Sequence, residues 1–162
     1  MGYYNPIFQI GEERYVQLSA RNGVDGLIVP DLPYEESGSL GESCRAKGVD
    51  LVQLVGPTTS AARMKKIAAA SSGFLYVVSS LGTTGAKGQL SKGAGEVVQR
   101  AKGVAGDLPI GVGFGISRHE HAEALYREGA DAAIVGSAIL QGIIDGASPQ
   151  ETRRFVRELK GP

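Results

Sequence analysis

The sequence has few of the residues that bind metals or form disulfides. Its 162 residues include one cysteine, two histidines and no tryptophan. Because Cys44 has no second cysteine to pair with, the chain cannot form an internal disulfide, which is typical of proteins in a reducing cytoplasm. One cysteine and two histidines are also too few ligands for a zinc site. We therefore expect a cytoplasmic protein that binds no metal.

The sequence also lacks an excess of charge of either sign and any long apolar run. Seventeen Lys and Arg balance seventeen Asp and Glu, so the formal net charge is zero. Without a basic stripe, nucleic acid is not an expected partner. No run approaches the ~20 apolar residues of a membrane span, and Met1–Pro6 has no signal-peptide pattern. With 42 % apolar residues, the chain is expected to form one globular domain over residues 1–162.

Glycine is abundant, at 24 of 162 residues, and is spread along the chain. A glycine, an apolar residue and an aspartate precede an apolar run three times, starting at Gly23, Gly48 and Gly129. Each pattern predicts a helix end with a glycine cap, a short turn and a buried strand. Continuous apolar runs are typical of a parallel sheet covered on both faces. The expected strands are 26–29, 51–55, 74–78, 109–112 and 132–135.

Segments with helical spacing alternate with these strands. Ser60 and Ser148 are expected to cap helix N-termini, and Ser117 with Glu120 is expected to form a capping box. The expected helices are 12–21, 34–47, 60–70, 95–102, 117–127, 138–144 and 149–159. This order, one helix and then five βα units, predicts parallel strands with right-handed crossovers. A closed eight-unit barrel needs ~250 residues, so the sequence has room for about five units.

Two glycine turns near the C-terminus carry the clearest chemical signal. Gly113–Ser117 and Val135–Ala138 each follow an apolar run and precede a helical segment. The free N–H groups of such a helix start, together with the helix dipole, suit a phosphate. Two such turns in succession suggest one phosphate held from two sides, as after strands seven and eight of a (β/α)8 barrel. The glycine- and threonine-rich loop Ser79–Lys92 is expected to act as a lid.

Several segments together resemble one known family, in family order and with family spacing. They are Tyr3–Pro6, Gly23–Gly26, Val29–Pro33, Pro57–Thr59, Ser79–Gly85, Val112–Ser117 and Val135–Ala138. Over nearly its whole length, the chain resembles the C-terminal two-thirds of the tryptophan synthase α subunit. The resemblance implies an α/β fold, a partial (β/α)8 TIM barrel whose five βα units correspond to strands four to eight.

The resemblance also implies an activity, a partner and roles for single residues. The family cleaves indole-3-glycerol phosphate to indole and glyceraldehyde 3-phosphate by a retro-aldol reaction, with no metal or organic cofactor. Indole then passes to a β subunit that holds pyridoxal phosphate. By motif, the phosphate site would contain Gly85, Gly115, Gly136 and Ser137, and the substrate pocket Tyr3, Tyr76, Phe114 and the lid residue Thr84. Asn5 and Asp31 would lie near the β subunit.

The family's catalytic Glu and Asp lie before the position that Met1 matches. We therefore expect the chain to lack both carboxylates and to be inactive alone. Two non-catalytic alternatives are a phosphate-binding fragment and a docking partner of the β subunit. Another phosphate-binding barrel, such as an isomerase of the same pathway, is disfavoured by Tyr3–Pro6 and by Pro30–Pro33. Tyr76 could instead be a plain core residue. Strand edges at 26–29 and 132–135 are expected to favour self-association.

Overall fold

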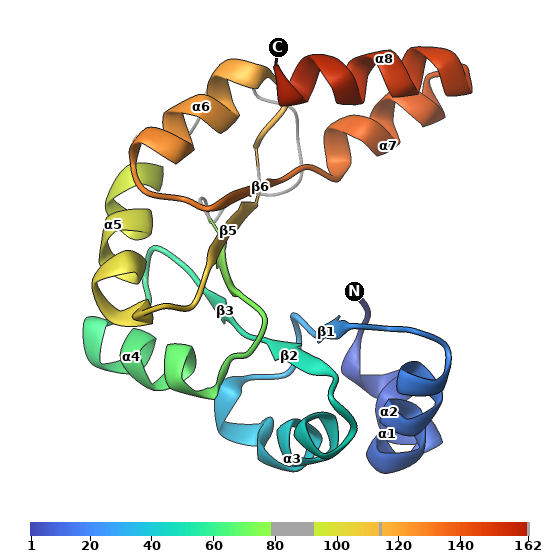
Figure 1. Cartoon of the computed structure of the whole chain (residues 1–162), viewed down its shortest axis with the longest axis vertical. Coiled ribbons are helices and arrows are strands. Elements are labelled where there is room, and N and C mark those ends of the chain that lie inside the picture. The colour runs from blue at the N-terminus through green and yellow to red at the C-terminus, as the bar shows by residue number, and fades with distance from the viewer. Residues whose placement is uncertain (79–92, 114, 162) are drawn as a thin grey trace.

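A computed structural model describes residues 1–78, 93–113 and 115–161 as an α/β fold. The elements are α1 (Tyr4–Ile10), α2 (Glu12–Arg21), β1 (Gly26–Ile28), the 3-10 turn η1 (Tyr34–Glu36), α3 (Gly38–Lys47), β2 (Asp50–Val52), β3 (Leu54–Val55), α4 (Ala61–Ala70), β4 (Leu75–Val78), α5 (Ala94–Ala105), β5 (Ile110–Gly113), α6 (His119–Arg127), β6 (Ala132–Ile134), α7 (Ser137–Ile144) and α8 (Pro149–Lys160). Figure 1 shows an open crescent, with strands on the inner side and α3 to α6 on the outer side. Among the described residues, no helix is long and apolar enough to cross a membrane.

All strand pairs are parallel, as the sequence predicts. β1 pairs with β2, and β3, β4, β5 and β6 pair in chain order. The expected strand 51–55 is broken at Gln53, whose N–H donates to Ser71 Oγ at 3.0 Å instead of to a neighbouring strand. Its buried side chain donates from Nε2 to Ser37 Oγ at 2.9 Å. One stretch of chain therefore gives β2 to the first sheet and β3 to the second.

Two apolar cores hold the helices on the outer side of the sheet. The larger core lies between α4, α5 and α6 and strands β4 and β5, and includes Met64, Leu75, Val98, Val112 and Leu125. The smaller core joins α1, α2 and α3 to β1 and β2, and includes Ile7, Val16, Leu27, Leu40 and Leu51. Because the helices cover only the outer face, the inner face of the sheet remains on the concave side of the crescent.

The structure confirms two of the predicted caps and corrects a third. Ser60 Oγ accepts the Arg63 N–H, and Ser148 forms a capping box with Glu151. The predicted cap at Ser117 is wrong: α6 begins at His119, and the Ser117 N–H donates to His121 Nδ1 at 3.3 Å.

Two further helix expectations need correction. Residues 34–47 do not form one helix, because Ser37 separates η1 from α3 and its hydroxyl donates to the Tyr34 carbonyl. The sequence analysis did not predict the helix α1. Pro6 is compatible with it because it lies in the first turn, where an N–H has no partner within the helix.

The two ends of the crescent differ. At one end, the Gly2 N–H donates to the Ile28 carbonyl at 3.0 Å, so the residues before α1 already lie along β1. At the other end, within the described part of the chain, β6 pairs only with β5, and Ala132 is exposed. The expected open edge is therefore present at β6 and partly covered at β1.

Candidate functional site

The two predicted phosphate-binding turns leave neighbouring strands at the same level. Gly113 of β5 is the Cα partner of Ile134 of β6. Gly115 and Gly136 each come two residues after this pair. Because the strands are parallel, both turns lie at the carboxyl edge of the sheet, where ligands bind in folds of this class.

The first turn contains a backbone conformation that favours glycine. Gly115 has φ +77°, it is exposed, and an added Cβ there would meet no atom within 4 Å. A residue with a side chain is therefore disfavoured at position 115 by the backbone angle and not by a lack of space. Phe114, a predicted pocket residue, lies outside the described residues.

The second turn opens directly into α7. Gly136 is the N-cap residue and Ser137 the first helical residue, and both are exposed. The N–H groups of Ile139 and Leu140 donate to the Gly136 carbonyl, each at 3.0 Å. The N–H groups of Ser137 and Ala138 precede these first helical bonds, so they are the donors that a helix start offers to an anion.

Tyr76 lies on the inner face of the sheet, next to the first turn. Its neighbours in β4, Leu75 and Val77, belong to the larger core, so alternation turns Tyr76 to the other face. A Cβ added at Gly113 would lie 2.7 Å from Tyr76 Cε1, which means that the ring crosses β5 at its carboxyl end. Burial raises the pKa of the Tyr76 phenol. Tyr76 is 5 % exposed, so it is packed like a core residue although it lies on the inner face of the sheet.

The loop between β3 and α4 is held by hydrogen bonds from a residue that is distant in sequence and that the sequence analysis did not identify. Arg100 of α5 donates from Nη1 to the Pro57 carbonyl at 3.1 Å and from Nη2 to the Thr59 carbonyl. Thr59 also closes the loop, because its N–H donates to the Gly56 carbonyl at 3.0 Å. No local signal marks Arg100, since its partners lie more than forty residues earlier in the chain.

The residues predicted to face a partner come together at the start of α1. The Asp31 carboxylate accepts the Tyr4 N–H, at 2.9 Å to Oδ1 and 3.1 Å to Oδ2. Asn5 is the next residue of α1, and both Asn5 and Asp31 are exposed. Tyr3 is 70 % exposed, so the described residues do not enclose it in a pocket.

Two predicted site residues, Thr84 and Gly85, lie outside the described residues. Two other groups that could take part in chemistry, Cys44 and His119, lie away from the two turns. Cys44 is buried in α3, and burial raises the pKa of its thiol to about 11. His119 lies on α6, where its Nδ1 is 3.2 Å from the Leu159 carbonyl. Within residues 1–78, 93–113 and 115–161, no three His, Cys, Asp or Glu side chains gather as a metal site requires.

Comparison with solved structures defines the class of fold. The chain matches a tryptophan synthase complex from Pyrococcus furiosus with a TM-score of 0.89 and 34 % identity, over 99 % of this chain and 64 % of that chain. An alpha subunit from the same organism matches with a TM-score of 0.89 and 35 % identity, over the same shares. The described strands and helices thus form a large part of a (β/α)8 TIM barrel.

Comparison with known sequences defines the family. A family model described as tryptophan synthase alpha chain matches residues 1–160. The tryptophan synthase alpha chain of Methanosarcina mazei is 45 % identical over 161 residues, which are 99 % of this chain and 58 % of the relative. That of Methanocaldococcus jannaschii is 50 % identical over 139 residues, 86 % of this chain and 49 % of the relative. The chain belongs to the tryptophan synthase alpha chain family, and it spans between about half and three-fifths of the length of these two relatives.

Proposed function

We propose that the chain carries the phosphate-binding end of a site that cleaves indole-3-glycerol phosphate to indole and glyceraldehyde 3-phosphate in tryptophan biosynthesis. One observation supports this function above the others. Gly115 and Gly136 follow paired residues of adjacent parallel strands at equal distance along the chain, and the second opens α7. Backbone N–H groups from two such turns can bind one phosphate from two sides.

In this site, backbone groups hold the phosphate and side chains line the indole pocket. Gly115, Gly136 and Ser137 would bind the phosphate, and Gly85 would add a third contact from the loop. Tyr76 would line the indole pocket together with Tyr3 and Phe114, and Thr84 would belong to the lid. The position of the Tyr76 ring over the end of β5 supports its part, because the pocket and the phosphate then share one edge of the sheet.

We also propose that the chain does not turn over this substrate by itself. A retro-aldol cleavage needs a general acid and base at the glycerol chain and a group that stabilises positive charge on the indole. Asp31 is the one carboxylate predicted at the strand ends. It is occupied by the Tyr4 N–H at the start of α1, which disfavours a role in proton transfer. The two catalytic carboxylates would then come from a preceding part of the barrel.

Phosphate binding can be tested without any turnover. Inorganic phosphate and glyceraldehyde 3-phosphate are titrated into the ¹⁵N-labelled chain, and the amide shifts of Gly115, Gly136 and Ser137 are followed by NMR. Ser137→Asp places a negative charge at the start of α7, where it suits the helix dipole but repels phosphate. Gln141→Glu adds the same charge one turn later as a control. Weakened binding in Ser137→Asp alone supports the site, and equal binding in both variants overturns it.

Turnover is tested by release of indole from indole-3-glycerol phosphate. We expect the 162-residue chain to release none above the buffer rate. Addition of a separate N-terminal family segment, which carries the family's first strands and its two catalytic carboxylates, is expected to produce release. Turnover by the chain alone would overturn the assignment of the catalytic carboxylates to a preceding segment.

A role as a partner of a tryptophan synthase β subunit is the second candidate. One similar structure, with 37 % identity and a TM-score of 0.88, is described as the tryptophan synthase a2b2 complex of Pyrococcus furiosus. In this chain, Phe8 is 65 % and Tyr3 70 % exposed near the predicted interface residues Asn5 and Asp31. Exposed aromatic side chains of this kind favour a protein interface. Co-sedimentation with a tryptophan synthase β subunit tests this role, and loss of binding in Phe8→Asp would support it.

A further inference from the structure

The turn that follows β5 is held at its far end by a histidine of α6. The Ser117 N–H donates to His121 Nδ1 at 3.3 Å. Ile116, between Gly115 and Ser117, is buried in the larger core. The two residues after Gly115 are therefore held in place, one by its side chain and the other by its N–H. Gly115 itself is exposed, and its positive φ lets the chain turn at this point.

His121 is the third residue of α6, a position from which a side chain can reach back to the residues before the helix. In a capping box, a Glu or Gln at this position accepts the N–H of the N-cap residue. In α6 the N-cap residue, Arg118, makes no side-chain cap bond, and His121 accepts the N–H of the residue before it, Ser117. A neutral imidazole accepts at Nδ1 without carrying a negative charge. It can therefore hold the turn without repelling an anion bound there.

The bond from Ser117 defines the protonation state in which His121 can act. Nδ1 accepts a hydrogen bond only when it carries no proton, so the ring must be neutral, with its proton on Nε2. Protonation of Nδ1 converts the acceptor into a donor, and the Ser117 N–H then loses its partner. Among the residues that the structure describes, the Ser117 N–H is the only hydrogen-bond partner of this ring.

His119, two residues earlier on α6, has the opposite requirement. Its Nδ1 lies 3.2 Å from the Leu159 carbonyl oxygen, and its Nε2 lies 3.4 Å from Glu123 Oε1. Both partners are acceptors, so only a ring with protons on both nitrogens can donate to both. In Figure 1 the end of α8 lies beside the start of α6, and His119 contacts that end of α8 and not the turn. His119 is therefore a matched comparison for His121.

The elements packed against α6 are α5, β6 and α8. β6 has no titratable side chain, and α5 approaches the other end of α6, where its Gln99 donates to Glu128 at 2.6 Å. The charged groups near the start of α6 are therefore those of its own first residues and of the last turn of α8: Arg118, Glu120, Glu158 and Lys160. This set contains charges of both signs. The bond from Ser117 is thus the specific contact that distinguishes the two states of His121.

We propose that His121 is a positioning residue for the phosphate site. As a neutral imidazole it holds the Ser117 N–H, and it thereby keeps the backbone of Gly115 and Ile116 in the conformation that presents N–H groups to an anion. This inference rests on the proposed phosphate binding by the two turns. It adds a residue that does not itself touch the phosphate, and it makes the shape of the turn depend on one proton.

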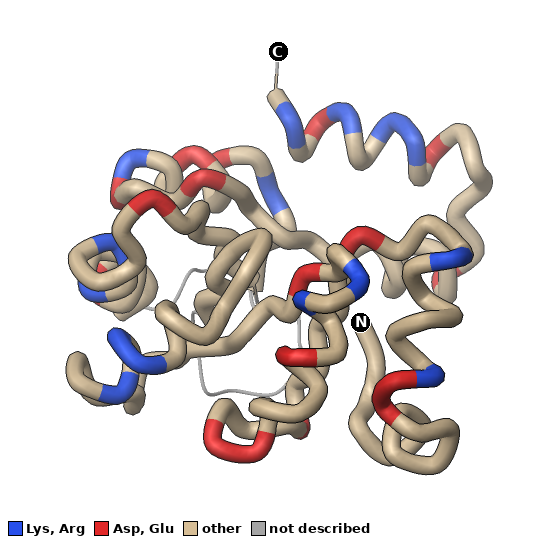
Figure 2. Tube along the Cα trace, turned by 60° about the horizontal axis from the view of Figure 1, so that its bottom comes forward, with Lys and Arg blue, Asp and Glu red and all other residues tan. Residues whose placement is uncertain are grey.

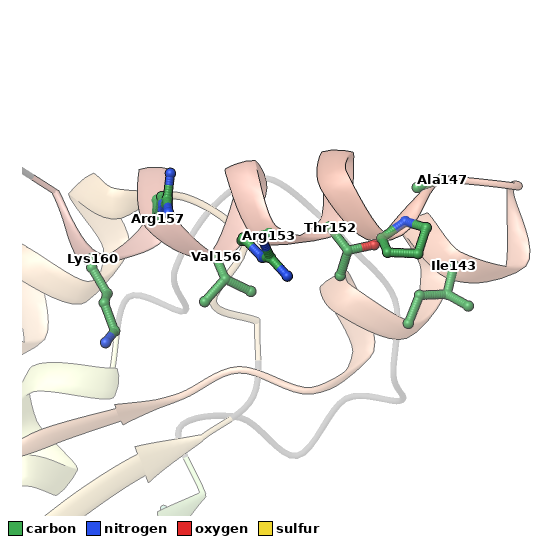
Figure 3. Close-up of a pocket in the computed structure, with 8 residues that line it drawn as sticks. Ile143, Ala147, Thr152, Arg153, Val156, Arg157 and Lys160 are labelled. Atoms are coloured by element: carbon green, nitrogen blue, oxygen red, sulfur yellow. The ribbon is translucent and has the colours of Figure 1, made fainter.

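A second cationic surface makes a site-resolved measurement necessary. Arg153, Arg157 and Lys160 line a hollow of about 580 Å³ between α7 and α8, which Figure 3 shows. Figure 2 shows further basic residues along α8. Such a surface attracts anions by charge alone. Phosphate binding is therefore measured from the amide signals of the two turns and not from the total heat of binding.

The experiment follows the ¹⁵N-labelled 162-residue chain by NMR, without ligand and with inorganic phosphate, at about pH 7.5, where an ordinary imidazole is mostly neutral. His121→Leu removes the acceptor. His121→Asn keeps a neutral acceptor, the amide oxygen. In His121→Leu we expect faster exchange of the Ser117 amide with water and about threefold to tenfold weaker phosphate binding, the effect of one lost hydrogen bond. His121→Asn should restore both, and the control His119→Leu should change neither.

A pH series without ligand tests the same bond in the unaltered chain. Between about pH 8 and pH 5, the Ser117 amide signal should shift together with the ring signals of His121, and in His121→Asn it should not. Equal Ser117 exchange in His121→Leu and the parent would overturn the inference. So would faster exchange with unchanged phosphate binding. Absence of phosphate binding in the parent, with the Ser117 amide still following His121, would overturn the proposed function and leave the hold of His121 on the turn in place.

Discussion

Asp31 caps α1 from the loop after β1. Its two carboxylate oxygens lie 2.9 and 3.1 Å from the Tyr4 N–H, across 27 residues of sequence. Tyr3, the N-cap residue itself, supplies no side-chain bond. The cap therefore comes from a residue outside the helix, and Asp31 ties α1 to the first sheet.

Asp31→Ala is expected to lower the free energy of unfolding by about 1 kcal/mol, the usual cost of losing a helix N-cap. Asp31→Asn keeps an acceptor oxygen and should lose less. Urea unfolding followed by far-UV circular dichroism measures both differences. Equal stability of the alanine variant and the parent would show that the carboxylate does not support α1.

Gly113→Ala is expected to destabilise the chain by about 1–3 kcal/mol, because the added methyl group would overlap the Tyr76 ring and force it to move. Gly103→Ala is the matched control. Gly103 lies in α5 with no atom within 4 Å of an added Cβ, so the change should stabilise by about 0.4–1 kcal/mol. Thermal unfolding of the two variants should shift in opposite directions, and a shift in the same direction would contradict the steric reason.

The elements that could be predicted from the sequence are those whose signals are local. Each strand was expected from its own apolar run, and the caps at Ser60 and Ser148 from a serine three residues before the N–H it accepts. The turns at Gly115 and Gly136 could be predicted for the same reason. Spacing along the chain placed them at the ends of neighbouring parallel strands, and the register of β5 and β6 agrees.

The features that could not be predicted depend on partners far away in the sequence. The break at Gln53 needs Ser37 and Ser71, and the loop at Pro57 needs Arg100. The expected cap at Ser117 was wrong for a local reason: α6 begins at His119, and His121 Nδ1 accepts the Ser117 N–H that Glu120 would accept in a capping box. One non-local feature had a signal that could have been used. The alternating glycines of β5, Gly111 and Gly113, leave room for two aromatic rings, from Phe74 just before β4 and from Tyr76 in β4.

Arg100→Gln is expected to loosen the loop between β3 and α4. The guanidinium donates to two carbonyls of this loop, and hydrogen bonds from charged groups contribute about 1.5–3 kcal/mol. Hydrogen exchange at the Thr59 amide, which closes the loop onto Gly56, should become faster. Arg100→Lys can reach one carbonyl at a time and should give an intermediate rate. Unchanged exchange in both variants would contradict the role of Arg100.

Asp131 is expected to contribute to the loss of stability in acid. Lys102 donates to its carboxylate at 2.8 and 3.1 Å and the Ile110 N–H at 2.7 Å, and these bonds lower the pKa of Asp131. Because the folded-state pKa is lowered, the contribution is fully present above the ordinary pKa of the carboxyl. It is lost as the pH falls through the lowered folded-state value.

Asp131→Asn should therefore reduce the difference in unfolding free energy between about pH 6 and pH 2. Lys102→Met alone should also reduce it, and adding Lys102→Met to Asp131→Asn should have little further effect on the pH dependence. Urea unfolding at a series of pH values measures all three variants. An additive effect of the two changes would show that the pair does not act as one unit.

The chain alone is expected to self-associate at micromolar concentration. The edge of β6 and the exposed face of α7 lie together at one end of the crescent, and unpaired strands beside apolar side chains favour association. Replacing Leu140 and Ile144 of α7 by aspartate should shift the distribution toward monomer, whereas Phe8→Asp at the opposite end should not. Sedimentation velocity over a range of concentrations separates the species. A clean monomer for the parent chain, with one sharp cooperative thermal transition, would show that the open end is stable in water without a partner.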